Sequence, residues 1–92
     1  MKEDMYSTLL GKLVQITYKP ESRMNNEVAF FADQDSHFVR LDNFVKYEKT
    51  GKDEFNLLTE VRASGVRNKD LIDKMDVSSE KLKEVYNKSI SK

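Results

Sequence analysis

The sequence predicts a mainly β domain, a small barrel or sandwich with a short N-terminal helix and an added C-terminal helix. Four or five short segments have the apolar pattern of strands, and the turns between them are too short for alternating β and α units. Near the C-terminus the apolar spacing becomes helical. A chain of 92 residues has room for one core, so we expect one domain over residues 1–76 and a helix over residues 77–92.

Three segments in the first half of the chain have strand patterns. Residues 12–18 alternate between apolar and polar positions, and Pro20 ends the alternation. Residues 27–32 are short, apolar and aromatic, which favours a strand buried on both faces. Residues 37–47 continue the pattern with a change of phase near Asp42, which indicates a bend or bulge.

The expected N-terminal helix is a single turn that covers the domain as a lid. Asp4 is placed to cap this turn and Gly11 to end it. Its apolar side chains share one side and are Met5, Tyr6, Leu9 and Leu10.

The second half of the chain predicts further short strands. Residues 48–54 have the character of a hairpin loop, and residues 55–62 follow as a strand. A tight turn at residues 63–65 then leads to Val66, which begins a short fifth strand. Residues 71–75 fit either a last strand or another helical turn.

The C-terminal segment at residues 78–90 has the apolar spacing of an amphipathic helix. Ser78 is a suitable N-cap, and Val77 with Leu82 fits a hydrophobic staple. We expect this helix to be a solvated cover with one apolar stripe.

The composition of the chain excludes several classes of protein and of binding site. The chain has no cysteine, which excludes disulfides and thiolate metal sites, so self-association is expected to supplement the small core. No apolar run has the length of a signal peptide or membrane span, and we expect a cytoplasmic protein without a membrane partner. Sixteen basic and sixteen acidic side chains cancel, so any nucleic-acid site must be local.

The order of these features resembles the Sm-like (Lsm) family, whose fold is a strongly bent, SH3-like barrel of five strands. The second family motif is similar to residues 61–66, with residues 66–68 as a rival match. The family glycine early in the second strand is replaced, since Asn26 or Glu27 occupies that region. The first family motif is similar to Leu9, Leu10, Gly11, Lys12, Val14, Ile16, Asp33, Phe38, Val39, Leu41 and Asp42.

The resemblance implies non-enzymatic binding of single-stranded RNA by a cyclic homo-oligomer, without a cofactor. In this family a base stacks at the pore, between the loops that follow the second and fourth strands. Carried over by position, the first loop places Asp35 and His37 at the RNA. The second loop supplies Arg62, with Arg67 as its rival, and Asp33 is expected to brace the first loop.

Each of these residues also has a structural interpretation. A loop histidine is most often a polar surface residue, and Arg62 or Arg67 can equally pair with a carboxylate. Asp33, Asp35 and His37 have a spacing compatible with a metal, but no fourth ligand accompanies them. One histidine and no cysteine leave few ways to build a nucleophile with its base, so we expect neither an enzyme nor a metal site.

The main alternative function is a protein-interaction or structural adaptor on an SH3-like barrel, without nucleic-acid binding. The zero net charge favours this alternative. The aromatic side chains Tyr18, Phe30, Phe31 and Phe38 are expected to lie in the core or in an interface.

Overall fold

One antiparallel sheet makes up most of the molecule. The computed structural model describes residues 6–52 and 54–90. The strand order is β4-β3-β2-β1-β5, which confirms the mainly β prediction and the five strands. The strands are β1 (Leu13–Tyr18), β2 (Asn26–Gln34), β3 (Phe38–Gly51), β4 (Glu54–Asn68) and β5 (Ile72–Val77), and the helix α1 (Glu80–Ile90) follows them.

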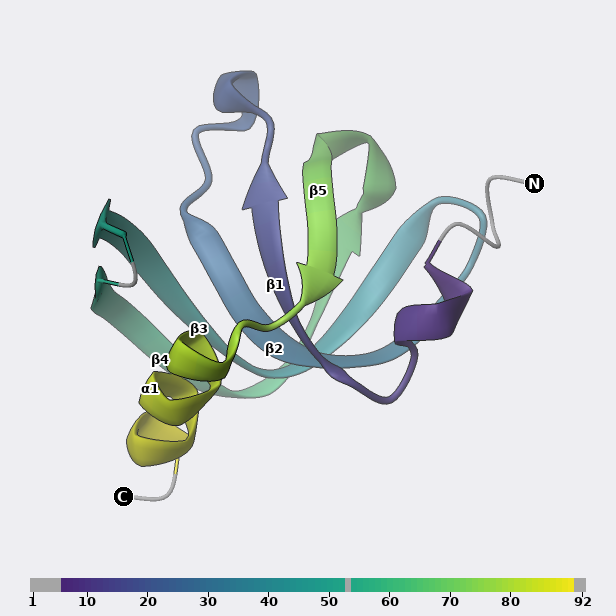
Figure 1. Cartoon of the computed structure of the whole chain (residues 1–92). Coiled ribbons are helices and arrows are strands. Elements are labelled where there is room, and N and C mark those ends of the chain that lie inside the picture. The colour runs from purple at the N-terminus through teal and green to yellow at the C-terminus, as the bar shows by residue number, and fades with distance from the viewer. Residues whose placement is uncertain (1–5, 53, 91–92) are drawn as a thin grey trace.

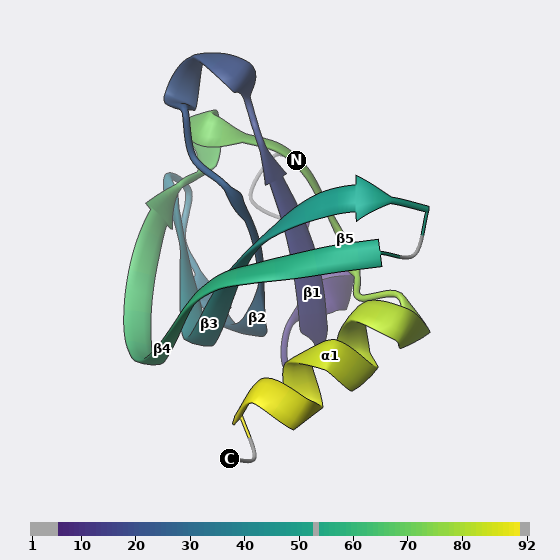
Figure 2. The same cartoon turned by 90° about the vertical axis from the view of Figure 1, so that its left-hand side faces the viewer.

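The sheet is bent into an open trough (Figure 1). β4 and β5 are its two edges, and within residues 6–52 and 54–90 no ladder of hydrogen bonds joins them. The predicted five-stranded barrel is therefore not confirmed. Figure 2 shows the β3–β4 hairpin extending over α1.

The two faces of the sheet carry separate apolar clusters. The inner cluster draws side chains from β3 and β5, which are not neighbours, so the sheet curls around this face. The outer cluster lies under α1. The buried inner residues are Tyr6, Val14, Ile16, Tyr18, Ala29, Phe31, Val39, Leu41, Phe44, Ile72 and Met75. The buried outer residues are Leu13, Val28, Val45, Tyr47, Leu82 and Tyr86.

The described part of the N-terminal segment contains a short helical turn, as expected. It is a 3-10 turn at Ser7–Leu9, and the expected cap Asp4 lies outside the described residues, as does Met5. Gly11 ends the turn with a φ of 79°, a left-handed conformation that glycine adopts without strain. Tyr6 is buried and meets the edge of the Phe31 ring, with the ring centroids 6.4 Å apart.

The bulge predicted near Asp42 is present in β3. The pairing of β3 with β4 shifts between Asp42 and Phe44, and Asn43 has a φ of 51°. The extra residue changes the phase of the strand, so that Leu41 and Phe44 both face inward. The hydroxyl of Tyr86 donates to the carbonyl of Asn43 at 2.7 Å and ties α1 to the bulge.

β4 continues without a break, so the turn predicted at residues 63–65 is wrong. Gly65 lies in the strand opposite Leu41. The small side chains before Gly65 have a turn-like composition, but β3 supplies hydrogen-bonding partners for this segment. The last strand is β5, which follows a 3-10 turn at Lys69–Leu71, and most of the undecided residues 71–75 thus belong to a strand.

The predicted C-terminal helix is present, but its N-cap lies one residue later than expected. The backbone N–H of Leu82 donates to Ser79 Oγ at 3.2 Å, so Ser79 is the N-cap. Ser78 instead continues the pairing with β1, its N–H donating to the Leu13 carbonyl. A hydrophobic staple uses the residue directly before the N-cap, which here is Ser78 and not Val77. The Val77 side chain is accordingly 52% exposed. In the described part of the chain, no helix has the length and apolar character needed to cross a membrane.

Candidate functional site at the β2–β3 turn

Arg62 and Arg67, the two candidates for the arginine of the predicted site, lie at different places along β4. Asp35 and His37 lie in the turn between β2 and β3. Arg67 pairs with Val39 in the adjoining part of β4, and the Lys69 N–H donates to the His37 carbonyl at 2.8 Å. Arg62 lies farther along β4, where its Nε donates to Glu60 at 2.9 Å. Residues 66–68, rather than Arg62, therefore adjoin the turn.

The carboxylate of Asp35 braces the turn. Its Oδ1 accepts hydrogen bonds from the backbone N–H groups of His37 and Phe38, both at 2.8 Å. These two bonds, His37 first, favour the ionised form and hold the pKa of Asp35 below its ordinary value of 3.8. Asp33, which was expected to brace the loop, accepts within the described residues from the N–H of the next residue, Gln34. Bracing of the turn itself thus falls to Asp35.

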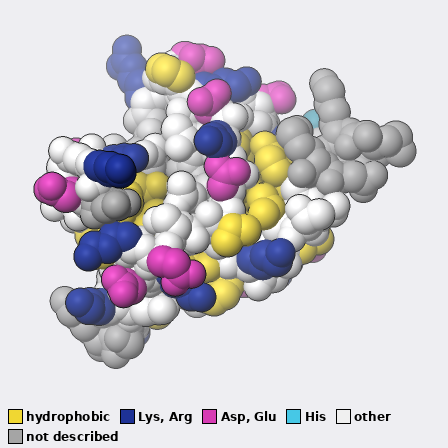
Figure 3. All heavy atoms as spheres, viewed as in Figure 1, with side chains coloured by type: hydrophobic (Ala, Val, Ile, Leu, Met, Phe, Trp, Pro, Cys, Tyr) yellow, Lys and Arg dark blue, Asp and Glu magenta, His cyan; other side chains and the backbone are white. Residues whose placement is uncertain are grey.

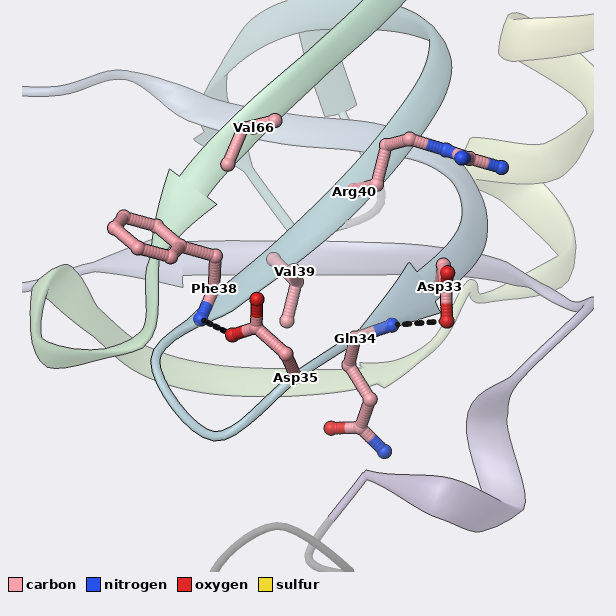
Figure 4. A pocket seen from close by; sticks show the side chains of 7 residues that line it. All are labelled: Asp33, Gln34, Asp35, Phe38, Val39, Arg40 and Val66. Atoms are coloured by element: carbon pink, nitrogen blue, oxygen red, sulfur yellow. Dashed lines mark hydrogen bonds between the residues drawn. The ribbon is translucent and has the colours of Figure 1, made fainter.

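A small open pocket of about 130 Å³ lies beside this turn (Figure 4). Arg40 of β3 is opposite Asp33 on one side and Val66 on the other, so these three residues share the outer face. Two exposed apolar side chains border the space, Phe38 at 43% exposure and Val66 at 59%. The lining residues are Asp33, Gln34, Asp35, Phe38, Val39, Arg40 and Val66.

Phe38 is not part of the core, although the sequence suggested a core or interface role. Its ring lies 6.4 Å from that of His37, centroid to centroid, with a tilt of 35°. Phe30 is also 43% exposed and meets Tyr86 of α1 edge to face, while Phe31 and Tyr18 are buried. The side-chain alternation of β3 offered a signal, since Phe38 is out of phase with the buried Val39 and Leu41.

Arg67 is directed away from the pocket, into the trough. Its Nη2 and Nε donate to the two carboxylate oxygens of Glu27 at 2.8 and 3.0 Å. The Tyr18 hydroxyl donates to the same carboxylate, and the guanidinium lies 4.5 Å from the centre of the Phe44 ring. The Glu27 side chain is fully buried and that of Arg67 is 14% exposed.

The contacts among Glu27, Arg67 and Tyr18 favour a charged Arg67 and a protonated Tyr18. The hydrogen bonds from Arg67 to Glu27 outweigh burial and raise the pKa of Arg67. Burial, and then the negative charge of Glu27, raise the pKa of Tyr18 far above its ordinary value. Gly65 leaves space for the guanidinium, because a Cβ there would lie 2.9 Å from Arg67 Nη1 and 3.0 Å from Phe44 Cε1. The sequence signal for this cluster was Glu27 itself, a charged residue in a predicted buried strand.

Side chains of both positive and negative charge lie in and near the pocket. Arg40 is half exposed, and its Nε lies 3.8 Å from an oxygen of Asp42. Lys69 Nζ is buried and lies 5.9 Å from the centre of the Tyr6 ring, and it has no hydrogen-bond partner among the residues that the structure describes. Among the residues that the structure describes, no group of three or more His, Asp and Glu side chains is arranged to hold a metal ion.

The arrangement therefore offers stacking surfaces, hydrogen-bond acceptors and one exposed cation. No family model, curated protein or solved structure matches this chain, so its functional assignment depends on the chain's own residues.

Proposed function

We propose that this protein binds single-stranded RNA at the β2–β3 turn, without chemistry, as a protomer of a cyclic homo-oligomer. The observation that carries the proposal is the exposed ring pair of His37 and Phe38 beside the open pocket. Unpaired bases expose their flat faces and stack on such rings. Arg40, at the opposite side of the pocket, supplies a cation for the phosphate chain.

Arg67 has a positioning role in this proposal. The resemblance to Sm-like proteins implied that an arginine stacks on the base, but this guanidinium is held by Glu27. Its anchoring joins β4 to β2, which are not neighbours in the sheet. Val66 and the end of β4 are thereby kept beside the turn.

The two sheet edges support the assembly. The outer sides of β4 and β5 carry backbone groups that the sheet of one protomer does not pair. Pairing β4 of one protomer with β5 of the next continues the sheet across the contact, and a closing rotation gives a ring. Along β4, Leu57 and Leu58 are 36% and 40% exposed and would be covered by such a neighbour.

The adaptor function is a second candidate, favoured by the carboxylates of the pocket. Asp33 and Asp35 repel a phosphate chain and attract a basic side chain, next to the apolar Phe38 and Val66. Figure 3 shows Lys and Arg side chains interspersed with Asp and Glu on the face it presents, without a field of one sign. This candidate predicts binding of a peptide that combines an apolar side chain with Lys or Arg.

Fluorescence anisotropy with a labelled single-stranded RNA of mixed sequence tests the proposal. Phe38→Ala should weaken binding roughly fivefold to a hundredfold, the usual effect of losing one base–aromatic stack. Phe30→Ala is the matched control, because Phe30 has the same exposure but lies against α1. Equal affinities of the two variants would place the RNA elsewhere. Absence of RNA binding by the native protein, with binding of a basic apolar peptide, would favour the adaptor.

Native mass spectrometry at low micromolar concentration tests the assembly. A single closed oligomer supports pairing of β4 with β5 of the neighbouring protomer. A monomer or dimer would rule out the ring and leave a binding module that acts alone.

A further inference from the structure

Two carboxylates, those of Asp33 and Asp35, supply hydrogen-bond acceptors to the lining of the pocket. Asp35 uses Oδ1 for the two N–H groups of the turn, and within the described residues no hydrogen bond engages its Oδ2. Figure 4 shows this second oxygen on the pocket side of the turn, directed toward the part of the pocket where Phe38 and Val66 lie. The carboxylate of Asp33 is a second acceptor on the lining. A ligand that stacks on Phe38 therefore meets a negatively charged acceptor at its edge.

We infer that this pocket selects cytosine and adenine, which carry an amino group at pyrimidine C4 or purine C6, over uracil and hypoxanthine, which carry a carbonyl at that position. The inference rests on the proposed RNA binding and adds the base preference of the same site. Cytosine N4 and adenine N6 donate hydrogen bonds, whereas uracil O4 only accepts. An ionised carboxylate also only accepts, so uracil O4 and Asp35 Oδ2 would face each other without a proton between them.

The turn holds the selecting oxygen in place before a ligand arrives. The two N–H bonds to Oδ1 fix the orientation of the Asp35 carboxylate, which lowers the entropy lost on binding. Arg40 does not supply a competing donor at this point, since Figure 4 shows its guanidinium directed away from Asp35. Phe38 provides the base face and Asp35 reads the base edge.

Oligo(C) and oligo(U) of equal length form the sharpest test, because the two rings differ at the 4-position while the backbone is identical. Anisotropy titrations of the native protein at one fixed salt concentration should show oligo(C) binding roughly tenfold tighter, the effect of one good base-edge contact. Oligo(A) should exceed oligo(I) in the same way. These comparisons need no variant and are independent of any effect on folding.

Asp35→Asn should reverse the preference. The asparagine Oδ1 still accepts from the turn N–H groups, while an amide NH₂ replaces the free Oδ2 and donates to uracil O4. Asp33→Asn is the matched control, since it removes the same charge from the pocket without changing Asp35. It should raise the affinity for both oligonucleotides by a similar factor and keep the preference for oligo(C).

The outcomes separate base selection from RNA binding. Equal affinities of the native protein for oligo(C) and oligo(U), or an unchanged preference in Asp35→Asn, would overturn the base selection and leave the RNA-binding proposal standing. Failure of the native protein to bind any of the four oligonucleotides would overturn both.

Discussion

Carboxylates and arginines occur on both faces of the sheet, and burial gives the two sets different roles. Inside the trough, Glu27 is fully buried and is neutralised by two hydrogen bonds from Arg67 and one from Tyr18. On the outer face, Asp35 and Arg40 are exposed, and no ion pair joins them among the described residues. A buried charge must find its partner within the fold, whereas an exposed one stays solvated and can meet a ligand. Residue type alone therefore does not assign function in this protein.

The ion pair between Glu27 and Arg67 connects strands that the backbone does not connect directly. β2 and β4 are separated by β3 in the sheet, and the pair of Glu27 and Arg67 connects them across the trough. This ion pair thus joins two strands that no ladder of backbone hydrogen bonds pairs directly. Removal of the ion pair between Glu27 and Arg67 should destabilise the fold, whereas changes in the outer pocket should affect stability much less.

The largest effect is expected for Arg67→Ala. It leaves the buried Glu27 charge without its partner, a change that typically costs about 3–5 kcal/mol of folding free energy. Arg62→Ala is the matched control, because Arg62 is half exposed and pairs with Glu60 at the surface, where a loss below about 1 kcal/mol is usual. Urea denaturation followed by circular dichroism measures both.

A double variant sharpens this result. Glu27→Leu combined with Arg67→Met replaces both charges by apolar groups, and it should recover most of the stability lost in Arg67→Ala. Similar losses for Arg67→Ala and Arg62→Ala would show that the inner pair does not support the fold.

Alkaline pH should destabilise the fold through two buried tyrosines, Tyr18 of the inner cluster and Tyr47 of the outer cluster. Burial raises the pKa of Tyr47 from its ordinary value of 10.0 to about 12, and the pKa of Tyr18 is also raised. A tyrosine with a raised pKa stabilises the fold fully below pH 10.0, and for Tyr47 this contribution, roughly 2–3 kcal/mol, is lost as the pH rises to about 12. Urea denaturation midpoints from pH 8 to about pH 12 measure it, and a Tyr47→Phe variant that loses stability as steeply would contradict the assignment.

Gly65→Ala should have a moderate effect on the inner cluster. The added Cβ would lie 2.9 Å from Arg67 Nη1 and displace the guanidinium from Phe44, at an expected loss of about 1–3 kcal/mol. Gly51→Ala is the control, since the nearest described atoms to its Cβ belong to the Glu54 side chain, with Oε1 at an ordinary 3.4 Å. Thermal unfolding compares the two, and equal melting temperatures would mean that Arg67 does not need the space at Gly65.

Acid pH should produce the smallest effect, confined to the outer pocket. The lowered pKa of Asp35 means that its contribution to the turn is complete above its ordinary value of 3.8 and is lost as the pH falls through the lower folded-state value. NMR should show the amide signals of His37 and Phe38 shifting with a midpoint below 3.8. A midpoint above that value would indicate that the two hydrogen bonds to Asp35 are not maintained in solution.

Local patterns in the sequence predicted those elements whose signals lie within a few residues. The alternation of residues 12–18 became β1, the change of phase near Asp42 became the bulge, and the helical spacing after Ser78 became α1. The continuity of β4 was missed, because the small residues around Gly65 have the composition of a turn until a paired strand is placed beside them.

The sequence by itself determined the first two strands, the bulge, the C-terminal helix and the candidate turn at Asp35 and His37. Only the tertiary structure decided that Glu27 and Arg67, 40 positions apart, would meet in the trough and that Phe38 would stay exposed. Alternation along a strand indicates which side chains share a face, but not what lies against that face. The path of the chain decides that. α1 covers the outer face over Val28 and leaves it open beside Phe38, so the covered part is core and the open part is available to a ligand.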